Sequence, residues 1–257
     1  RLLRRLQPLW APGAALTYAQ GKWYPGEQLP RWGLYCHWRA VGEPVWTDPA
    51  LLASDDDRDD ATAKDAAEFA TLLAGRLGVD PRLRMPAHED IHHYLWREKM
   101  LPANVLAEDS KLRDPMERAR LARVFGQGLA AEVGSVLPLR RAGVGEARAW
   151  ESGRWSFREG ELFLIPGDSP IGYRLPLDSL PWASEAAIEA EPERDPFARR
   201  EPFRPRRDYP EGRGRIIEQP VPEPGREEPG VVRTALCVES RGGLIHVFLP
   251  PLAVAED

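Results

Sequence analysis

The chain has 257 residues, of which 42% are hydrophobic and 29% charged, and its formal net charge is −5. This composition indicates a globular protein with enough apolar material for one large or two small cores. The acidic balance argues against a general nucleic-acid binder, and the lack of a run of about 18 apolar residues predicts that no segment spans a membrane. Because the first residue is Arg1 and not Met, we interpret the sequence as a piece of a longer polypeptide.

The segment from Gly21 to Asp48 holds four of the nine tryptophans, set among glycines, prolines and charged residues. Within it, Leu34, Cys36 and Trp38 alternate as in a half-buried strand. The remaining composition suits the rim of a ligand pocket, and it equally suits a loop whose tryptophans pack on a sheet edge. Four charged residues are candidates for contact with substrate or phosphate, with ordinary surface charge as the alternative: Lys22, Glu27, Arg31 and Arg39.

Three helices are predicted for the middle of the chain. The first covers Ala61 to Leu77, where apolar residues recur with a helical period, and Gly78 ends it. The second is expected from Ala87 to Met100 and the third from Asp114 to Leu129.

From Val133 onward the apolar period changes to two, which predicts short antiparallel strands. Trp150 to Leu177 is interpreted as a β-meander. Residues 184–230 contain nine of the 26 prolines and many charged residues, so we predict a flexible insertion or linker. The chain then divides into a mixed α+β region (1–183), this insertion (184–230) and a β-hairpin that begins the next part of a sheet (231–257).

One short motif suggests a metal site. His88, Glu89 and His92 satisfy H-E-x-x-H, and on a helix the two histidines share one face and could bind zinc while the glutamate activates water. Pro86 places His88 in the first turn of the predicted helix, and no third ligand is evident. We therefore predict that no zinc is tightly held, and a zinc hydrolase is the weakest functional hypothesis.

The two cysteines, Cys36 and Cys237, lie far apart in predicted strands and form neither a metal-binding pair nor a disulfide framework. They are expected to be buried thiols in a reducing compartment, which favours a cytoplasmic location.

Four blocks of the sequence are distinctive: GKWYPGEQLPRW, YLWREKMLPANVLAEDSKLRDPMERARLARVF, WESGRWSFREGELFLIPGDSPIGYRLPLDSLPW and VVRTALCVESRGGLIHVFLPP. Taken together, these blocks resemble a bacterial family of proposed amidoligases. In that family the region usually follows a transglutaminase-like domain in a very long chain, so the resemblance implies adjacent domains as partners. The family is held to be similar in fold to glutamine synthetase. The resemblance therefore implies an α+β domain, the cofactors ATP and Mg²⁺, and ligation of an amine to an activated carboxylate, with a peptide or amino-acid substrate.

A ligase of that kind needs several carboxylates on adjacent strands and cations that stabilise an acyl phosphate. In this sequence only Glu239 is expected on a strand, next to a predicted turn. The metal-binding residues are therefore expected outside residues 1–257, no catalytic residue is assigned, and the piece alone is predicted to be inactive. The alternative hypothesis is a non-catalytic binding or scaffold module of a transglutaminase-like multidomain protein.

Overall fold

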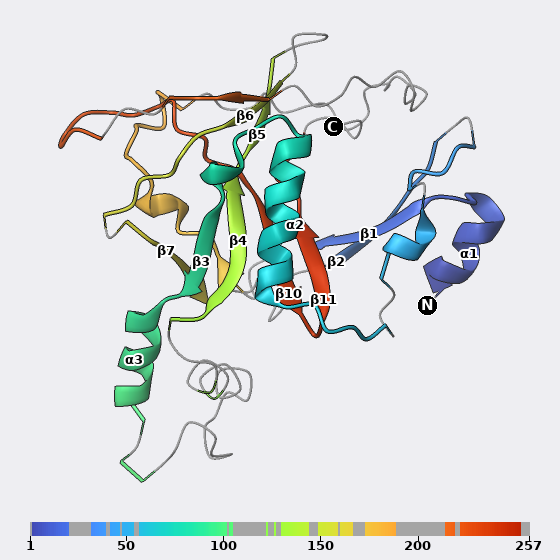
Figure 1. The fold of residues 1–257 in the computed structure, drawn as a ribbon, viewed down its shortest axis with the longest axis horizontal. Helices are drawn as coiled ribbons and strands as arrows, with labels where there is room; N and C mark the ends of the chain where they lie inside the picture. Colours follow the sequence, from blue (N-terminus) through green and yellow to red (C-terminus); the bar gives the residue numbers. More distant parts are fainter. Residues whose placement is uncertain are drawn as a thin grey trace.

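The computed structural model describes residues 2–20, 32–39, 42–46, 48–53, 57–101, 103, 104, 122, 126, 130–143, 149–158, 160–166, 173–188, 214–218 and 222–252 (Figure 1). The helices are α1 (Leu2–Trp10), α2 (Ala63–Arg76) and α3 (Ile91–Lys99). The strands are β1 (Ala15–Gln20), β2 (Trp32–His37), β3 (Met85–Glu89), β4 (Glu132–Pro138), β5 (Arg140–Ala142), β6 (Ala149–Ser152), β7 (Leu162–Pro166), β8 (Tyr173–Arg174), β9 (Gly214–Ile216), β10 (Ala235–Arg241) and β11 (Leu244–Phe248).

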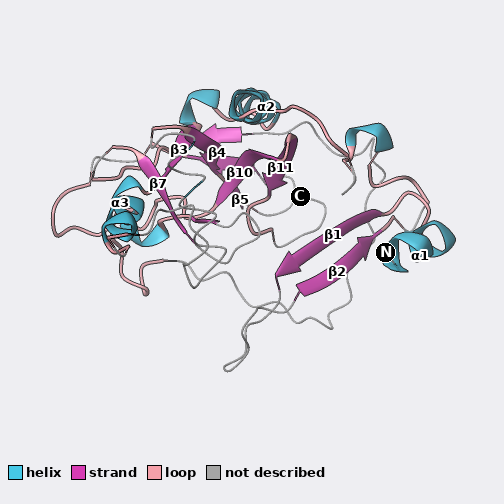
Figure 2. Cartoon of the chain, turned by 90° about the horizontal axis from the view of Figure 1, so that it is seen from below, coloured by secondary structure: helices cyan, strands magenta, loops and turns pink. Residues whose placement is uncertain are grey.

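The largest sheet has six strands in the order β11-β10-β4-β3-β7-β8. Its neighbours pair antiparallel except β3 and β7, which run parallel. A second sheet has the order β5-β6-β9, and β1 and β2 form a separate antiparallel pair beside α1 (Figure 2). This architecture confirms the predicted α+β class. None of the helices in the described ranges is long and apolar enough to cross a membrane.

Helix α2 packs on one face of the six-stranded sheet, which we call the α2 face (Figure 1). The helix begins at a capping box, in which Thr62 and Asp65 bond each other's backbone N–H groups. Three fully buried alanines one turn apart, Ala66, Ala70 and Ala74, let the helix approach β4 and β10 closely. The predicted helix over Ala61 to Leu77 is confirmed.

The opposite face, which we call the Trp155 face, is covered by segments without regular structure. Trp155 and Leu180 pack there against Ala87, Leu162 and other buried side chains of the sheet. The indole N–H of Trp155 donates to the carbonyl oxygen of Val232 at 2.5 Å, so this buried polar group is satisfied.

The second predicted helix is wrong over its first residues, because Met85–Glu89 is strand β3 and α3 begins at Ile91. Ala87 and Glu89 are buried while their neighbours are not, and this period of two belongs to a strand. The N-cap of α3 is Asp90, whose Oδ1 accepts from the backbone N–H of His93 at 3.0 Å.

The third predicted helix, Asp114 to Leu129, lies outside the described residues except for Ala122 and Gly126, which are helical. The β-meander is only partly present. β7 and β8 form an antiparallel pair, but β6 pairs with β5 and β9 in another sheet. The segment expected as a linker includes Gly214–Ile216, which pairs with β6 as strand β9. The hairpin predicted after residue 231 is confirmed as β10 and β11.

The turn of that hairpin provides a test of backbone strain. Gly243 has a φ of +78°, and a Cβ atom there would overlap the carbonyl oxygen of Asp59. We expect Gly243→Ala to lower the free energy of unfolding by more than about 2 kcal/mol, through a left-handed backbone penalty plus the overlap.

Two control variants separate these effects in denaturant titrations. Gly225 has the same φ of +78° with no atom near its Cβ position, so Gly225→Ala should cost about 1 kcal/mol. Gly230 has neither constraint, so Gly230→Ala should leave stability almost unchanged. Equal effects at Gly243 and Gly225 would show that Asp59 does not approach the turn.

Candidate functional site

Three glutamates are buried on strands. Glu89 on β3, Glu151 on β6 and Glu239 on β10 are 3%, 0% and 7% exposed. The expectation that Glu239 alone is a strand-borne carboxylate at a turn is therefore wrong. Glu239 lies within β10, opposite His246 of β11. A buried carboxylate is costly unless its charge is compensated, so each of the three needs an explanation.

Glu89 and Glu239 point to the Trp155 face. Ala87 belongs to the cluster on that face, and Glu89 follows it by two residues, which in a strand restores the same side. Cys237 also packs against this cluster, and Glu239 follows it by two residues on β10, so Glu239 lies on the same side. The two glutamates therefore share one face, on strands separated by β4.

A glycine lies between the two glutamate-bearing strands. Gly134 of β4 is opposite Ala87, and a Cβ atom at this glycine would lie 3.4 Å from the Cβ of Glu239. Because Gly134 has no side chain, β10 approaches β4 closely at this point, and the cavity beside Gly134 and Glu239 has a volume of only about 10 Å³. We call Glu89, Glu239, Arg241 and His246 the glutamate site.

The electrostatics of this site are set by Arg241. Its guanidinium forms an ion pair with Glu239, two residues earlier on the same strand. Burial, and then the charge of Arg241, lower the pKa of His246 from its ordinary 6.5, so this imidazole is neutral at neutral pH. Burial also raises the pKa of Cys237 to about 12, with a further contribution from Glu239, which keeps the thiol protonated and unreactive.

The glutamate site is not a complete metal centre. Glu89 and Glu239 are two strand spacings apart, about 10 Å between their Cα atoms, and two carboxylates alone do not complete the octahedral oxygen shell of Mg²⁺. In the part of the chain that the structure describes, no group of three or more His, Cys, Asp or Glu residues could hold a metal ion. The described residues therefore do not by themselves fit the Mg²⁺ that the resemblance implied.

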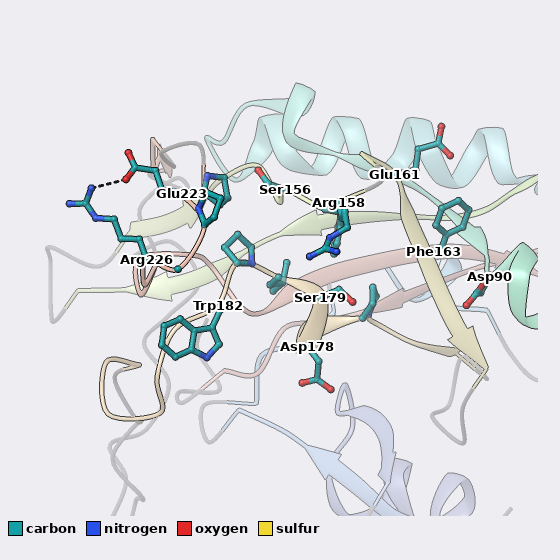
Figure 3. A pocket seen from close by; sticks show the side chains of 17 residues that line it. Asp90, Ser156, Arg158, Glu161, Phe163, Asp178, Ser179, Trp182, Glu223 and Arg226 are labelled. Atoms are coloured by element: carbon teal, nitrogen blue, oxygen red, sulfur yellow. Dashed lines mark hydrogen bonds and ion pairs between the residues drawn. The ribbon is translucent and has the colours of Figure 1, made fainter.

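A wide pocket begins where β3 ends. Its volume is about 1130 Å³, and Asp90, the residue after Glu89, lines it (Figure 3). The walls come from β7, from the segment around Arg158, and from two proline-containing segments that include Trp182 and Arg226. The glutamate site and this pocket thus meet at the end of one strand.

Hydrogen bonds to backbone carbonyl groups hold the two proline-containing walls together. The backbone N–H of Glu228 donates to the carbonyl oxygen of Trp182 at 2.9 Å, and the guanidinium of Arg233 donates to that of Pro181 at 2.5 Å. On the rim, Arg226 and Glu223 form an exposed ion pair at 3.1 Å.

The substrate contacts predicted from the sequence stay predictions. Lys22, Glu27 and Arg31 lie outside the described residues. Arg39 is half-buried just after β2, in the region of the two-stranded sheet. The sequence named Glu89 in the H-E-x-x-H motif and Glu239 as a strand carboxylate, but it related neither to the other, and no short motif marks the residues of the pocket. The sequence signal that was present is the alternation of Met85 and Ala87, which places Glu89 on the same side of a strand as Ala87.

The H-E-x-x-H motif is divided between a strand and a helix. His88 and Glu89 are neighbours on β3 and point to opposite faces of the sheet, while His92 lies in the first turn of α3. The Nδ1 atom of His88 lies 3.4 Å from the carbonyl oxygen of Ala131, and its ring is 6.4 Å from that of Phe163. The motif therefore lacks the helical geometry that a zinc hydrolase requires.

Glu151 has a structural role in the second sheet. Its carboxylate accepts from Arg140 Nε at 2.7 Å and from Arg215 Nε at 2.6 Å. Burial by itself raises the pKa of Glu151, but these hydrogen bonds and charges outweigh it, so the pKa lies below its ordinary value of 4.5. Arg215 belongs to β9, so this contact attaches the proline-rich region to the sheet.

Comparison with known protein families shows the family to which the chain belongs. A scan against protein families matches residues 1–257 to the family described as "Putative amidoligase enzyme (DUF2126)". The chain belongs to this amidoligase family, which confirms the resemblance seen in the four sequence blocks. A search of curated proteins and a search of solved structures each gave no match.

The Glu151 cluster predicts a stability effect that depends on pH. Near pH 7, Arg215→Ala should lower the free energy of unfolding by about 1 to 2 kcal/mol, because a buried carboxylate loses one of two partners that are themselves partly exposed. The pKa of Glu151 is lowered in the folded state. The stabilisation is therefore complete above pH 4.5 and is lost as the pH falls through the folded-state pKa.

Denaturant titrations between pH 7 and pH 3 measure this effect. Glu151→Gln should flatten the acid side of the stability profile. The matched control is Arg226→Ala, which removes an exposed ion pair and should change stability by less than about 0.5 kcal/mol. An Arg215→Ala effect no larger than this control would refute the buried pairing.

For the H-E-x-x-H motif we predict less than one zinc ion per chain after purification without a histidine tag. His88 lies on strand β3 and His92 in the first turn of α3, so the two histidines do not share one helix face as zinc ligands of this motif do. Elemental analysis of the purified protein and of His92→Ala measures the metal content. One zinc ion per chain that is lost in His92→Ala would restore the hydrolase hypothesis.

Proposed function

We propose that the chain forms part of an ATP-dependent amidoligase that joins an amine to an activated carboxylate. The observation that supports this most directly is the burial of Glu89 and Glu239 on one face of the sheet, on either side of Gly134, with a large pocket lined by Asp90, the residue after Glu89. The family description supplies the reaction class.

The chemistry of amide formation explains why buried carboxylates are useful. A carboxylate does not react with an amine at neutral pH until its oxygen becomes a leaving group, which ATP would supply by phosphorylation. The amine must also lose a proton as its nitrogen bonds to the activated carbon. A positioned carboxylate attracts the ammonium form and accepts this proton, and the effect is strong where water is excluded.

The residues of the glutamate site then have distinct roles. Glu89 and Glu239 would receive the amine and its proton. Arg241 would balance the charge of Glu239, and it is also suited to oxygens that gain negative charge. His246 would serve as a neutral hydrogen-bonding group. Magnesium would need ligands other than the described residues, so these roles concern only the organic substrates.

A second candidate function is a non-catalytic binding or scaffold module. It is favoured by the exposed apolar side chains of the N-terminal region, including Leu9, Trp10, Leu34 and Trp38. Such side chains commonly pack against another domain, in agreement with the proposal that adjacent domains of the same chain are the partners. A cytoplasmic location, and a peptide or amino-acid substrate, complete the proposed ligase function.

The decisive substitutions are Glu89→Gln and Glu239→Gln in the full-length protein. Each keeps the side-chain shape and removes the negative charge, so ligation turnover should fall at least about 100-fold. The measurement is release of ADP that depends on both amine and carboxylate, together with thermal unfolding. The matched control is Glu151→Gln, an equally buried glutamate of the other sheet, which should lose stability but keep its turnover per folded molecule.

Calorimetric titration with Mg²⁺-ATP separates the two candidate functions. Nucleotide binding is expected for the full-length protein, with turnover weakened by Lys22→Ala or Arg31→Ala. Full-length protein that binds no nucleotide would favour the scaffold function. Unchanged turnover in both glutamate variants would remove the glutamate site from the mechanism.

A further inference from the structure

The pocket that begins at Asp90 has an unusual balance of charge. Among the described residues that line it are four carboxylates and two guanidinium groups, and one of those guanidinium groups, Arg226, already pairs with Glu223. Arg158 is then a single positive group among Asp90, Glu161 and Asp178. The described part of the lining is acidic on balance, which disfavours ligands with several uncompensated negative charges.

Arg158 is placed to receive one anionic group. Its side chain forms no hydrogen bond or ion pair with any other residue in the described part of the chain. In Figure 3 its guanidinium lies near the middle of the view, between Ser156 and Ser179. A guanidinium group binds a carboxylate through two parallel hydrogen bonds, a geometry that a hydrated surface lysine does not offer.

The rest of the lining suits a peptide. Trp182 is 61% exposed, and Phe157, Phe163 and Leu180 add apolar surface. Prolines of both proline-containing walls lie beside them and provide rigid surface on which an extended chain can pack. A volume of about 1130 Å³ lies just above the usual range for small-molecule sites and far exceeds the volume of a single amino acid.

We infer that this pocket binds a peptide through one carboxylate group held by Arg158, with Trp182 and the neighbouring apolar side chains contacting the rest of the peptide. The inference rests on the proposed ligase function for its biological meaning, because it assigns the carboxylate substrate to the pocket and the amine to the glutamate site. The carboxylate is either the C-terminus of the peptide or an acidic side chain, since both present the same group to Arg158.

Three probes separate these sources. They are a neutral, N-acetylated five-residue peptide with a free carboxyl end, the same peptide with an amidated end, and the amidated peptide carrying one glutamate. Binding to the full-length protein is followed by calorimetry or by ligand-observed NMR, without nucleotide. One of the two carboxylate-bearing peptides should bind at least about tenfold more tightly than the neutral amide, and which one does so identifies the source.

The variants assign the effect to one residue. Arg158→Ala should abolish the preference for a carboxylate, and Arg158→Lys should retain only part of it. Arg226→Ala removes the other guanidinium of the pocket and should keep the preference. Trp182→Ala should weaken all three peptides alike. Because Arg158 is exposed, loss of folding is not expected, and thermal unfolding checks this.

Two results would overturn the inference: equal binding of all three peptides to the unaltered protein, or a carboxylate preference that survives Arg158→Ala. The assay requires no turnover. A failure of the ligase proposal therefore shows in the Glu89 and Glu239 variants, and a failure of the peptide pocket shows only here.

Discussion

The close packing of α2 on the six-stranded sheet is the constraint from which the chemistry of this chain follows. Three alanines bring the helix so near to β4 and β10 that the core of the α2 face is filled by apolar side chains. A buried carboxylate would be costly in this apolar layer, so the buried carboxylates of the sheet point to the opposite face. Glu89 and Glu239 do so, and the pocket opens at the same end of β3.

The buried carboxylates illustrate two uses of the same side chain. Glu151 forms ion pairs with two arginines, one of which belongs to β9, and so connects β6 to β9. Glu239 is paired with one arginine, on its own strand, and therefore does not link two strands. The number and position of the charged partners distinguish a candidate reactive group from a structural one, and burial alone does not.

The sequence predicted the elements whose signals are local. The helical period over Ala61 to Leu77 and the glycines before Leu244 were sufficient for α2 and the final hairpin. The strand Met85–Glu89 was missed because its five residues precede an unrecognised N-cap, Asp90, and merge with the helix that follows. The glutamate site could not be predicted, because the pairing of β3, β4 and β10 joins residues that no local pattern relates.

That pairing also determines when the protein can acquire its structure during synthesis. Val136 of β4 pairs with Cys237 of β10, so the centre of the sheet cannot close until the last part of this region has left the ribosome. At typical elongation rates, roughly 5 to 20 s pass between the synthesis of β4 and that of β10. During this time the apolar faces of α2 and of the earlier strands are not covered by β10. Protection of these faces by a chaperone, or by a neighbouring domain that has already folded, would therefore affect the yield of native protein more than any single contact within it.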